Sequence, residues 1–163
     1  MKILLEAPIL TQSGYGEHSR LVMASLMRQQ GVEIFLNPLD WGQTSWASSV
    51  EEKIQSEINV ASKRLREYAE KAKQEKQQMM FDMQIHVGIP SEFEKKAPIS
   101  VCVTAGIETD RVSHTWILKT HQGLNKLIVP SEHAKQGFVN TSYEVTNQAA
   151  NQKSIIGCNC PVE

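Results

Sequence analysis

Two glycines stand in residues 13–18 (Ser-Gly-Tyr-Gly-Glu-His), between a short apolar run and the start of a helical pattern. Glycine lets the backbone bend tightly, and it leaves the first N–H groups of a following helix uncovered. Such a helix start attracts phosphate or carboxylate groups. The stretch therefore predicts a ligand-binding turn, in which the substrate-binding residues are Ser13, Gly14, Tyr15, Gly16 and His18. Glycines that only turn the chain are the alternative interpretation.

A second group of reactive side chains follows the apolar run 99–103. Glu108 and Asp110 could each orient a substrate hydroxyl or accept its proton, as a general base does. Asp110 could instead only cap the next helix, a role that Thr109 could also take. Arg111 could pair with either carboxylate or meet an anionic ligand.

Several common sites do not fit the sequence. In a dinucleotide-binding pattern the third glycine would fall at Ser19, and no acidic residue closes the second predicted strand. No P-loop lysine follows the glycines, and no nucleophile elbow is present. Cys158 and Cys160 could supply two thiolates to a metal, but no second Cys or His pair has zinc-site spacing. We therefore expect no metal and no resident cofactor, and we interpret these cysteines as free thiols.

Apolar runs and helical periods alternate along the chain, and most predicted strands are followed by helices. This order predicts an α/β fold with a Rossmann-like, doubly wound and mostly parallel sheet. Ligands of such sheets collect outside the carboxyl ends of the strands, an edge that would carry residues 13–18, 41–46, 88–92, 104–111 and 131–133. Ser131 is placed to cap a helix. The predicted strands are 2–7, 32–36, 81–87, 99–103, 125–129 and 154–158, and the predicted helices are 15–30, 50–78, 111–121 and 132–139.

Two features leave alternatives open. The apolar stripe of the long helix 50–78 is typical of a helix that covers a sheet, but its spacing also fits a coiled-coil arm that forms a homodimer. Trp41 and Trp46 lie in the loop predicted for residues 37–49. They could stack on a sugar or base, or they could anchor the loop on the core. Past Thr141 the pattern fades, and a polar loop is suggested by Asn147, Gln148, Asn151 and Gln152.

The charge balance names no partner. A formal net charge of −1, from 17 basic and 18 acidic residues, gives no global field for binding nucleic acid. No run approaches the length of a membrane span, and the N-terminus does not resemble a signal peptide. The few, unevenly placed cysteines suit the reducing cytoplasm. The length fits one domain, which we place at residues 1–163.

The sequence resembles the amino-terminal half of group 1 glycosyltransferases over nearly the whole chain. The resemblance rests on the order and spacing of five pieces: Lys2-Ile-Leu-Leu5, residues 13–20, residues 86–93, residues 103–111 with Trp116, and residues 128–133 with Phe138. It implies a GT-B enzyme of the hexosyltransferase type, in which two Rossmann-like domains transfer a sugar from a nucleotide-sugar to an acceptor hydroxyl, usually without a metal. The amino-terminal domain of such an enzyme mostly holds the acceptor.

The resemblance also implies roles for particular residues. Gly14-Tyr15-Gly16 would approach the donor phosphates and the acceptor, and residues 106–110 would border the reacting centre. Many relatives carry a histidine in that loop, and this chain offers Glu108 and Asp110 as the catalytic residues instead. The further substrate-binding residues are Thr104, Gly106, Arg111 and Ser131.

The domain that holds the donor nucleotide would follow Glu163 and is absent from this chain. We therefore expect an acceptor-side domain that is incomplete and inactive alone, with the nucleotide-sugar bound mainly by the missing domain. The alternative is a non-catalytic α/β module for binding or oligomerisation.

Overall fold

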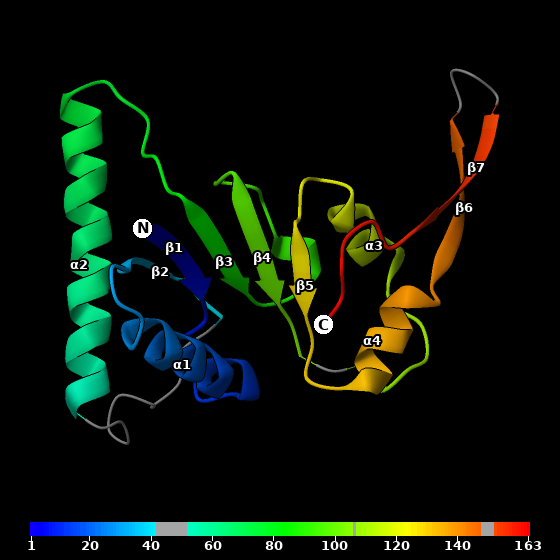
Figure 1. Cartoon of the computed structure of the whole chain (residues 1–163), viewed down its shortest axis with the longest axis horizontal. Coiled ribbons are helices and arrows are strands. Elements are labelled where there is room, and N and C mark those ends of the chain that lie inside the picture. The colour runs from blue at the N-terminus through cyan, green and yellow to red at the C-terminus, as the bar shows by residue number, and fades with distance from the viewer. Residues whose placement is uncertain (42–51, 106, 148–151) are drawn as a thin grey trace. The chain divides into compact units, whose positions relative to one another are not determined.

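The computed structural model describes residues 1–41, 52–105, 107–147 and 152–163, and it divides the chain into two compact units. The first unit is Met1–Val87 with Lys96–Ile99, and the second is Gly88–Lys95 with Ser100–Glu163. Figure 1 shows the strands β1 (Lys2–Ala7), β2 (Glu33–Pro38), β3 (Met83–Val87), β4 (Ile99–Val103), β5 (Lys126–Ile128), β6 (Ser142–Asn147) and β7 (Gln152–Gly157). The α-helices are α1 (Gly14–Met27), α2 (Glu52–Gln74), α3 (His114–Thr120) and α4 (Glu132–Val139), and η2 (Pro90–Glu92) is a 3₁₀ turn.

Five parallel strands form one sheet in the order β2-β1-β3-β4-β5. β1 pairs in parallel with both β2 and β3, and β4 pairs in parallel with β5. Because strands in such sheets are joined by crossover helices, β1, α1 and β2 form the βαβ unit that the sequence predicts. The α/β class and the Rossmann-like parallel sheet are confirmed, and the assignment to a GT-B half stays a prediction.

The core of the first unit lies between α2 and the strands. Leu4 of β1 and Phe35 of β2 cluster with Phe81, and the partly buried Leu65 and Tyr68 of α2 pack against them. The stripe of α2 thus faces the sheet, as the sheet-covering interpretation predicts. Its residues are therefore not available as the seam of a coiled coil, and a homodimer through residues 50–78 stays an untested prediction.

The core of the second unit gathers around β4, β5 and the two short helices. Cys102 and Leu127 pack with Ile117 of α3 and Phe138 of α4, all of them fully buried. Trp116 stacks on Phe138 with 5.8 Å between ring centroids. This packing fixes both helices beside the loops that leave the carboxyl ends of β4 and β5.

Two sequence predictions are wrong. Asn147 and Gln152, predicted to lie in a polar loop, belong to β6 and β7, which pair in an antiparallel hairpin, and no element was predicted for residues 142–146. Helix α3 begins at His114 and not at 111, and Ser113 caps it, so neither Thr109 nor Asp110 does. The backbone of Ser113 is not helical (φ −58°, ψ 144°), and its hydroxyl accepts the N–H of Thr115 at 3.3 Å, so the helix begins only after this residue.

No helix within the described ranges is both long and apolar enough to cross a membrane.

Candidate functional site

The turn after β1 is held by Ser13, which caps α1. The N–H of Gly16 donates to Ser13 Oγ at 3.1 Å, and the Ser13 and Thr11 hydroxyls are 2.8 Å apart. Thr11 Oγ1 donates its proton to the carbonyl of Pro8 at 2.8 Å, so Ser13 is the donor between the two hydroxyls. The Ser13 side chain is therefore engaged within the turn, where its hydroxyl both donates and accepts.

The two glycines of the turn have different environments. A Cβ atom on Gly16 would lie 2.0 Å from the carbonyl oxygen of Thr11, a distance that no real side chain could occupy. Gly16 is required because the preceding loop crosses the helix at this point. A Cβ atom on Gly14 would meet nothing within 4 Å, so packing gives no reason for a glycine there.

Arg20, which the sequence analysis did not single out, ties the same loop to α1. Its side chain is buried, and Nη1 donates to the carbonyls of Ile9 at 2.7 Å and Thr11 at 3.1 Å. Nη2 forms an ion pair with the exposed carboxylate of Glu17 one turn away. Arg20 lies on the buried face of α1 with Gly16, Ser19 and Met23, whereas Leu21 is 66% exposed, so the apolar pattern of the helix held no signal for this role.

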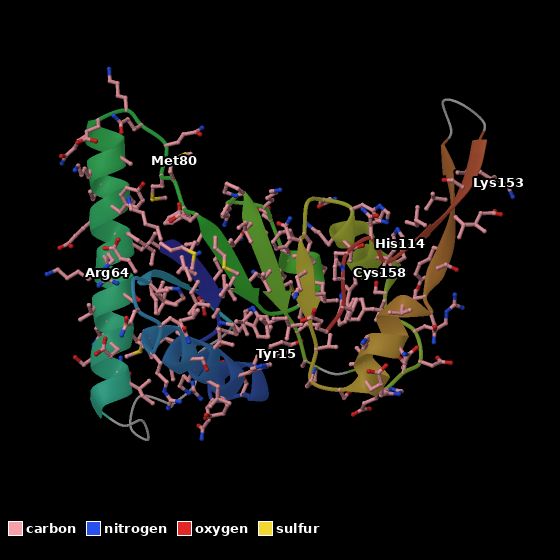
Figure 2. The ribbon with its side chains drawn as sticks, in the orientation of Figure 1. Tyr15, Arg64, Met80, His114, Lys153 and Cys158 are labelled. Atoms are coloured by element: carbon pink, nitrogen blue, oxygen red, sulfur yellow. The ribbon has the colours of Figure 1, made fainter. Side chains whose placement is uncertain are left out.

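Tyr15 and His18 of the predicted site are both half-buried. The ring of Tyr15 meets Trp41 edge to face, with 5.0 Å between centroids and an interplanar angle of 72°. Figure 2 labels Tyr15 at the start of α1. Trp41 thus contacts the turn, which decides neither the stacking nor the core-anchoring interpretation, and Trp46 lies outside the described residues.

A buried carboxylate lies at the carboxyl end of β1. Glu6 is 3% exposed, and its oxygens accept from Asn37 Nδ2 at 3.0 Å, Gln84 Nε2 at 2.7 Å and Lys96 Nζ at 2.7 Å. Gln84 in turn accepts the backbone N–H of Lys96 at 2.8 Å. Burial by itself would raise the pKa of Glu6, but the hydrogen bonds from Lys96, Asn37 and Gln84 and the charge of Lys96 outweigh it and lower that pKa. The group is thus held as a carboxylate.

No role was predicted for Glu6 from the sequence. Its strand register places Asn37 of β2 on one side and His86 of β3 on the other. A carboxylate inside a run that is otherwise apolar was the signal, since buried charges are almost always paired. The partners could not be located from sequence, because they lie 31, 78 and 90 residues away.

In the second unit, the loop after β4 carries the predicted catalytic carboxylates. Glu108 and Asp110 are both exposed, Thr104 is fully buried with its N–H bound to the carbonyl of Ile128 at 3.0 Å, and Gly106 lies outside the described residues. Arg111 reaches toward β6, where Nη2 donates to the carbonyl of Ser142 at 3.2 Å. The carboxylates are therefore presented to solvent on a loop whose end is tied to the hairpin.

Helix α4 packs closely on this loop. A Cβ atom on Gly137 would lie 2.7 Å from Ile107 Cδ1, so the glycine lets the loop approach the helix. Ser131 caps α4 as predicted, because its Oγ accepts the N–H of Ala134 at 3.2 Å. Like Ser13, Ser131 uses its side chain to cap a helix.

The structure thus gathers the predicted residues into two groups. Ser13, Gly14, Tyr15, Gly16 and His18 meet at the start of α1 in the first unit, and the loop 104–111 with Ser131 belongs to the second unit. Among the described residues there is no group of three or more His, Cys, Asp or Glu side chains that could hold a metal ion. Comparison with known proteins gives no match to a protein-family model, a curated protein or a solved structure.

Proposed function

We propose that this chain is the acceptor-side domain of a GT-B glycosyltransferase, which transfers a hexose from a nucleotide-sugar to an acceptor hydroxyl. One observation carries the proposal: α1 starts openly at Gly14 and directly follows β1, the strand between β2 and β3 in the sheet. In parallel sheets of this order, ligands bind outside the carboxyl ends of the strands where the chain reverses direction across the sheet. That reversal lies between β1 and β3.

The proposal gives the two groups of residues different tasks. The open start of α1 would contact the substrate through backbone N–H groups, and the helix dipole would favour negative charge there. The exposed carboxylates of Glu108 and Asp110 would orient the acceptor hydroxyl and accept its proton. A second Rossmann-like domain would bind most of the donor nucleotide, so the chain alone should be inactive or nearly so.

Nuclear magnetic resonance of the isotope-labelled chain tests the first task. The chain is titrated with a panel of simple methyl glycosides, with inorganic pyrophosphate and with nucleotide-sugars. We expect weak binding of at least one glycoside that shifts the amide resonances around Gly14, and no sugar transfer. Gly14→Ala should weaken this response, because the added methyl group occupies the open space in front of the helix start.

Leu21→Ala is the matched control. Leu21 lies on the same helix and is 66% exposed, so this change should leave both the fold and the titration unaltered. Tight binding of a nucleotide-sugar, or measurable transfer by the 163 residues alone, would contradict the proposal. So would a panel in which no sugar and no anion perturbs residues 13–18.

A further inference from the structure

Two thiols meet in the segment that follows β7. Cys158 and Cys160 are both half-buried and both reduced, and their side chains hydrogen-bond to each other. Cys158 Sγ also lies 3.5 Å from the carbonyl oxygen of Cys160, so the chain folds back at Asn159. Figure 2 labels Cys158 on the final segment beside α3.

The end of α3 holds this bend in place. The N–H of Asn159 donates to Thr120 Oγ1 at 3.0 Å, and the Thr120 side chain also hydrogen-bonds to Cys158. His121 Nε2 lies 2.8 Å from the carbonyl oxygen of Gly157. These contacts fix the residues before and between the two cysteines, and they keep the two sulfur atoms on the same side of the bend.

We propose that Cys158 and Cys160 form a redox-active dithiol, in which Cys158 attacks a small-molecule disulfide such as glutathione disulfide and Cys160 resolves the product. This role is independent of the proposed sugar transfer.

The reaction balances as a thiol–disulfide exchange. The Cys158 thiolate forms a bond to one sulfur of glutathione disulfide, whose S–S bond breaks and releases one glutathione thiolate. Cys160 then loses its proton and attacks Cys158 Sγ, which breaks the mixed disulfide and releases the second glutathione. The two protein sulfurs are oxidised to one disulfide and the small disulfide is reduced to two thiols. One glutathione takes the proton that Cys160 releases, and the other takes from solvent the proton that Cys158 had already lost.

The surroundings divide the two roles between the cysteines. The hydrogen bond from the Cys160 thiol is the main cause that lowers the pKa of Cys158 to about 6, outweighing burial, with further help from the Cys160 backbone, Thr120 and the charge of His121. The same pairing, together with burial and the nearby Cys102, raises the pKa of Cys160. At neutral pH, roughly nine-tenths of Cys158 would then be thiolate, against about one-hundredth for an ordinary thiol. Cys158 is therefore the nucleophile.

The dithiol links two parts of the second unit. Residues 152–157 belong to the β6–β7 hairpin, and residues 161–163 run along β5, where the N–H of Leu127 donates to the carbonyl of Pro161 at 2.9 Å. A disulfide between residues 158 and 160 would restrain the bend between these parts. Oxidation should therefore slow the exchange of the Leu127 amide hydrogen, which this segment covers.

The test equilibrates the full chain with excess glutathione disulfide at neutral pH, alkylates the remaining thiols in denaturant and maps the peptides by mass spectrometry. We expect a disulfide between Cys158 and Cys160, with Cys102 alkylated. Cys160→Ser should accumulate one glutathione on Cys158, because the resolving thiol is gone. Cys102→Ala is the matched control, and it should oxidise as the unaltered chain does.

A second measurement separates the effect of the fold from that of sequence proximity. The pH dependence of iodoacetamide alkylation should have its midpoint near pH 6 for Cys158 in the folded chain and near the ordinary thiol pKa of 9.0 in urea. Equal midpoints in the two states would overturn the proposal. It would also fail if both thiols stayed reduced, if Cys102 joined the disulfide, or if Cys160 reacted first.

Discussion

Replacing Gly16 with alanine should destabilise the chain far more than replacing Gly14, although both glycines open the same helix. At Gly16 the new Cβ would stand 2.0 Å from the Thr11 carbonyl oxygen, and contacts below 3.0 Å essentially never occur, so this backbone atom must move by about 1 Å. At Gly14 nothing has to move. Comparing the two variants therefore separates the effect of the contact between Gly16 and the Thr11 carbonyl from the general preference of helices for alanine.

The magnitude follows from the contacts that this movement disturbs. The carbonyl of Thr11 accepts a hydrogen bond from the buried Arg20 guanidinium at 3.1 Å, and such charged hydrogen bonds contribute about 1.5–3 kcal/mol. The Thr11 hydroxyl also binds Ser13, whose helix cap is worth about 1 kcal/mol. Gly16→Ala should thus lower the free energy of unfolding by about 2–4 kcal/mol. Gly14→Ala should leave it unchanged or raise it by at most about 1 kcal/mol.

Urea denaturation followed by circular dichroism measures both variants against the unaltered chain. A Gly16→Ala variant within about 0.5 kcal/mol of the unaltered chain, the range of neutral surface changes, would refute the reasoning. A Gly14→Ala variant as unstable as Gly16→Ala would do so too, because it would show that the space in front of the helix start is not open.

Two further predictions concern buried hydrogen bonds. Lys96→Met should lower the free energy of unfolding by about 1–3 kcal/mol at neutral pH, since it removes the cation from the buried Glu6 while the Lys96 side chain is 44% exposed. The folded pKa of Glu6 is lowered, so in the unaltered chain its carboxylate adds to the free energy of unfolding above the unfolded pKa near 4.5. This contribution is lost as the pH falls through the folded pKa. When the urea midpoint is measured as a function of pH, the variant should therefore lose less stability in acid than the unaltered chain. Tyr143→Phe should lower the free energy of unfolding by about 1 kcal/mol, because the hydroxyl donates to the carbonyl of Val112 at 2.6 Å, and an unchanged urea midpoint would contradict this.

Strands that are buried on both faces could be read from the sequence. β1 and β4 begin and end at the predicted residues, because their side chains are almost all buried and so form continuous apolar runs. β6 could not be read in this way, since Ser142, Glu144 and Thr146 are exposed and their neighbours Tyr143 and Val145 are only half-buried. The strand does alternate polar and apolar residues, but its two apolar side chains make only a short signal, and its pairing with β7 supplies the order.

The features of the candidate site that could not be predicted from the sequence depend on contacts between residues that are far apart in the chain. The segment before α3 is tied to the distant Thr141 through the N–H of Val112, and the charge of Glu6 is paired with that of Lys96. Neither bond has a local signature. The cap at Ser131 was predicted, because a cap bonds to an N–H only three residues along the chain. Ser13 caps α1 over the same short distance, although it was predicted only as a ligand-binding residue.

The contacts around the start of α1 also limit how a ligand could be selected there. The hydroxyl of Ser13 and the guanidinium of Arg20 already form hydrogen bonds to atoms of the turn itself. These two side chains therefore stabilise the turn. A ligand at the open face of Gly14 would meet mainly backbone N–H groups, which attract anions and hydroxyls of many kinds. Preference for one sugar would then have to come from neighbouring side chains. The aromatic pair of Tyr15, which follows Gly14 in the chain, and Trp41 is the candidate for this role. Changes in this pair should therefore alter which glycoside binds, whereas Gly14→Ala should weaken all of them alike.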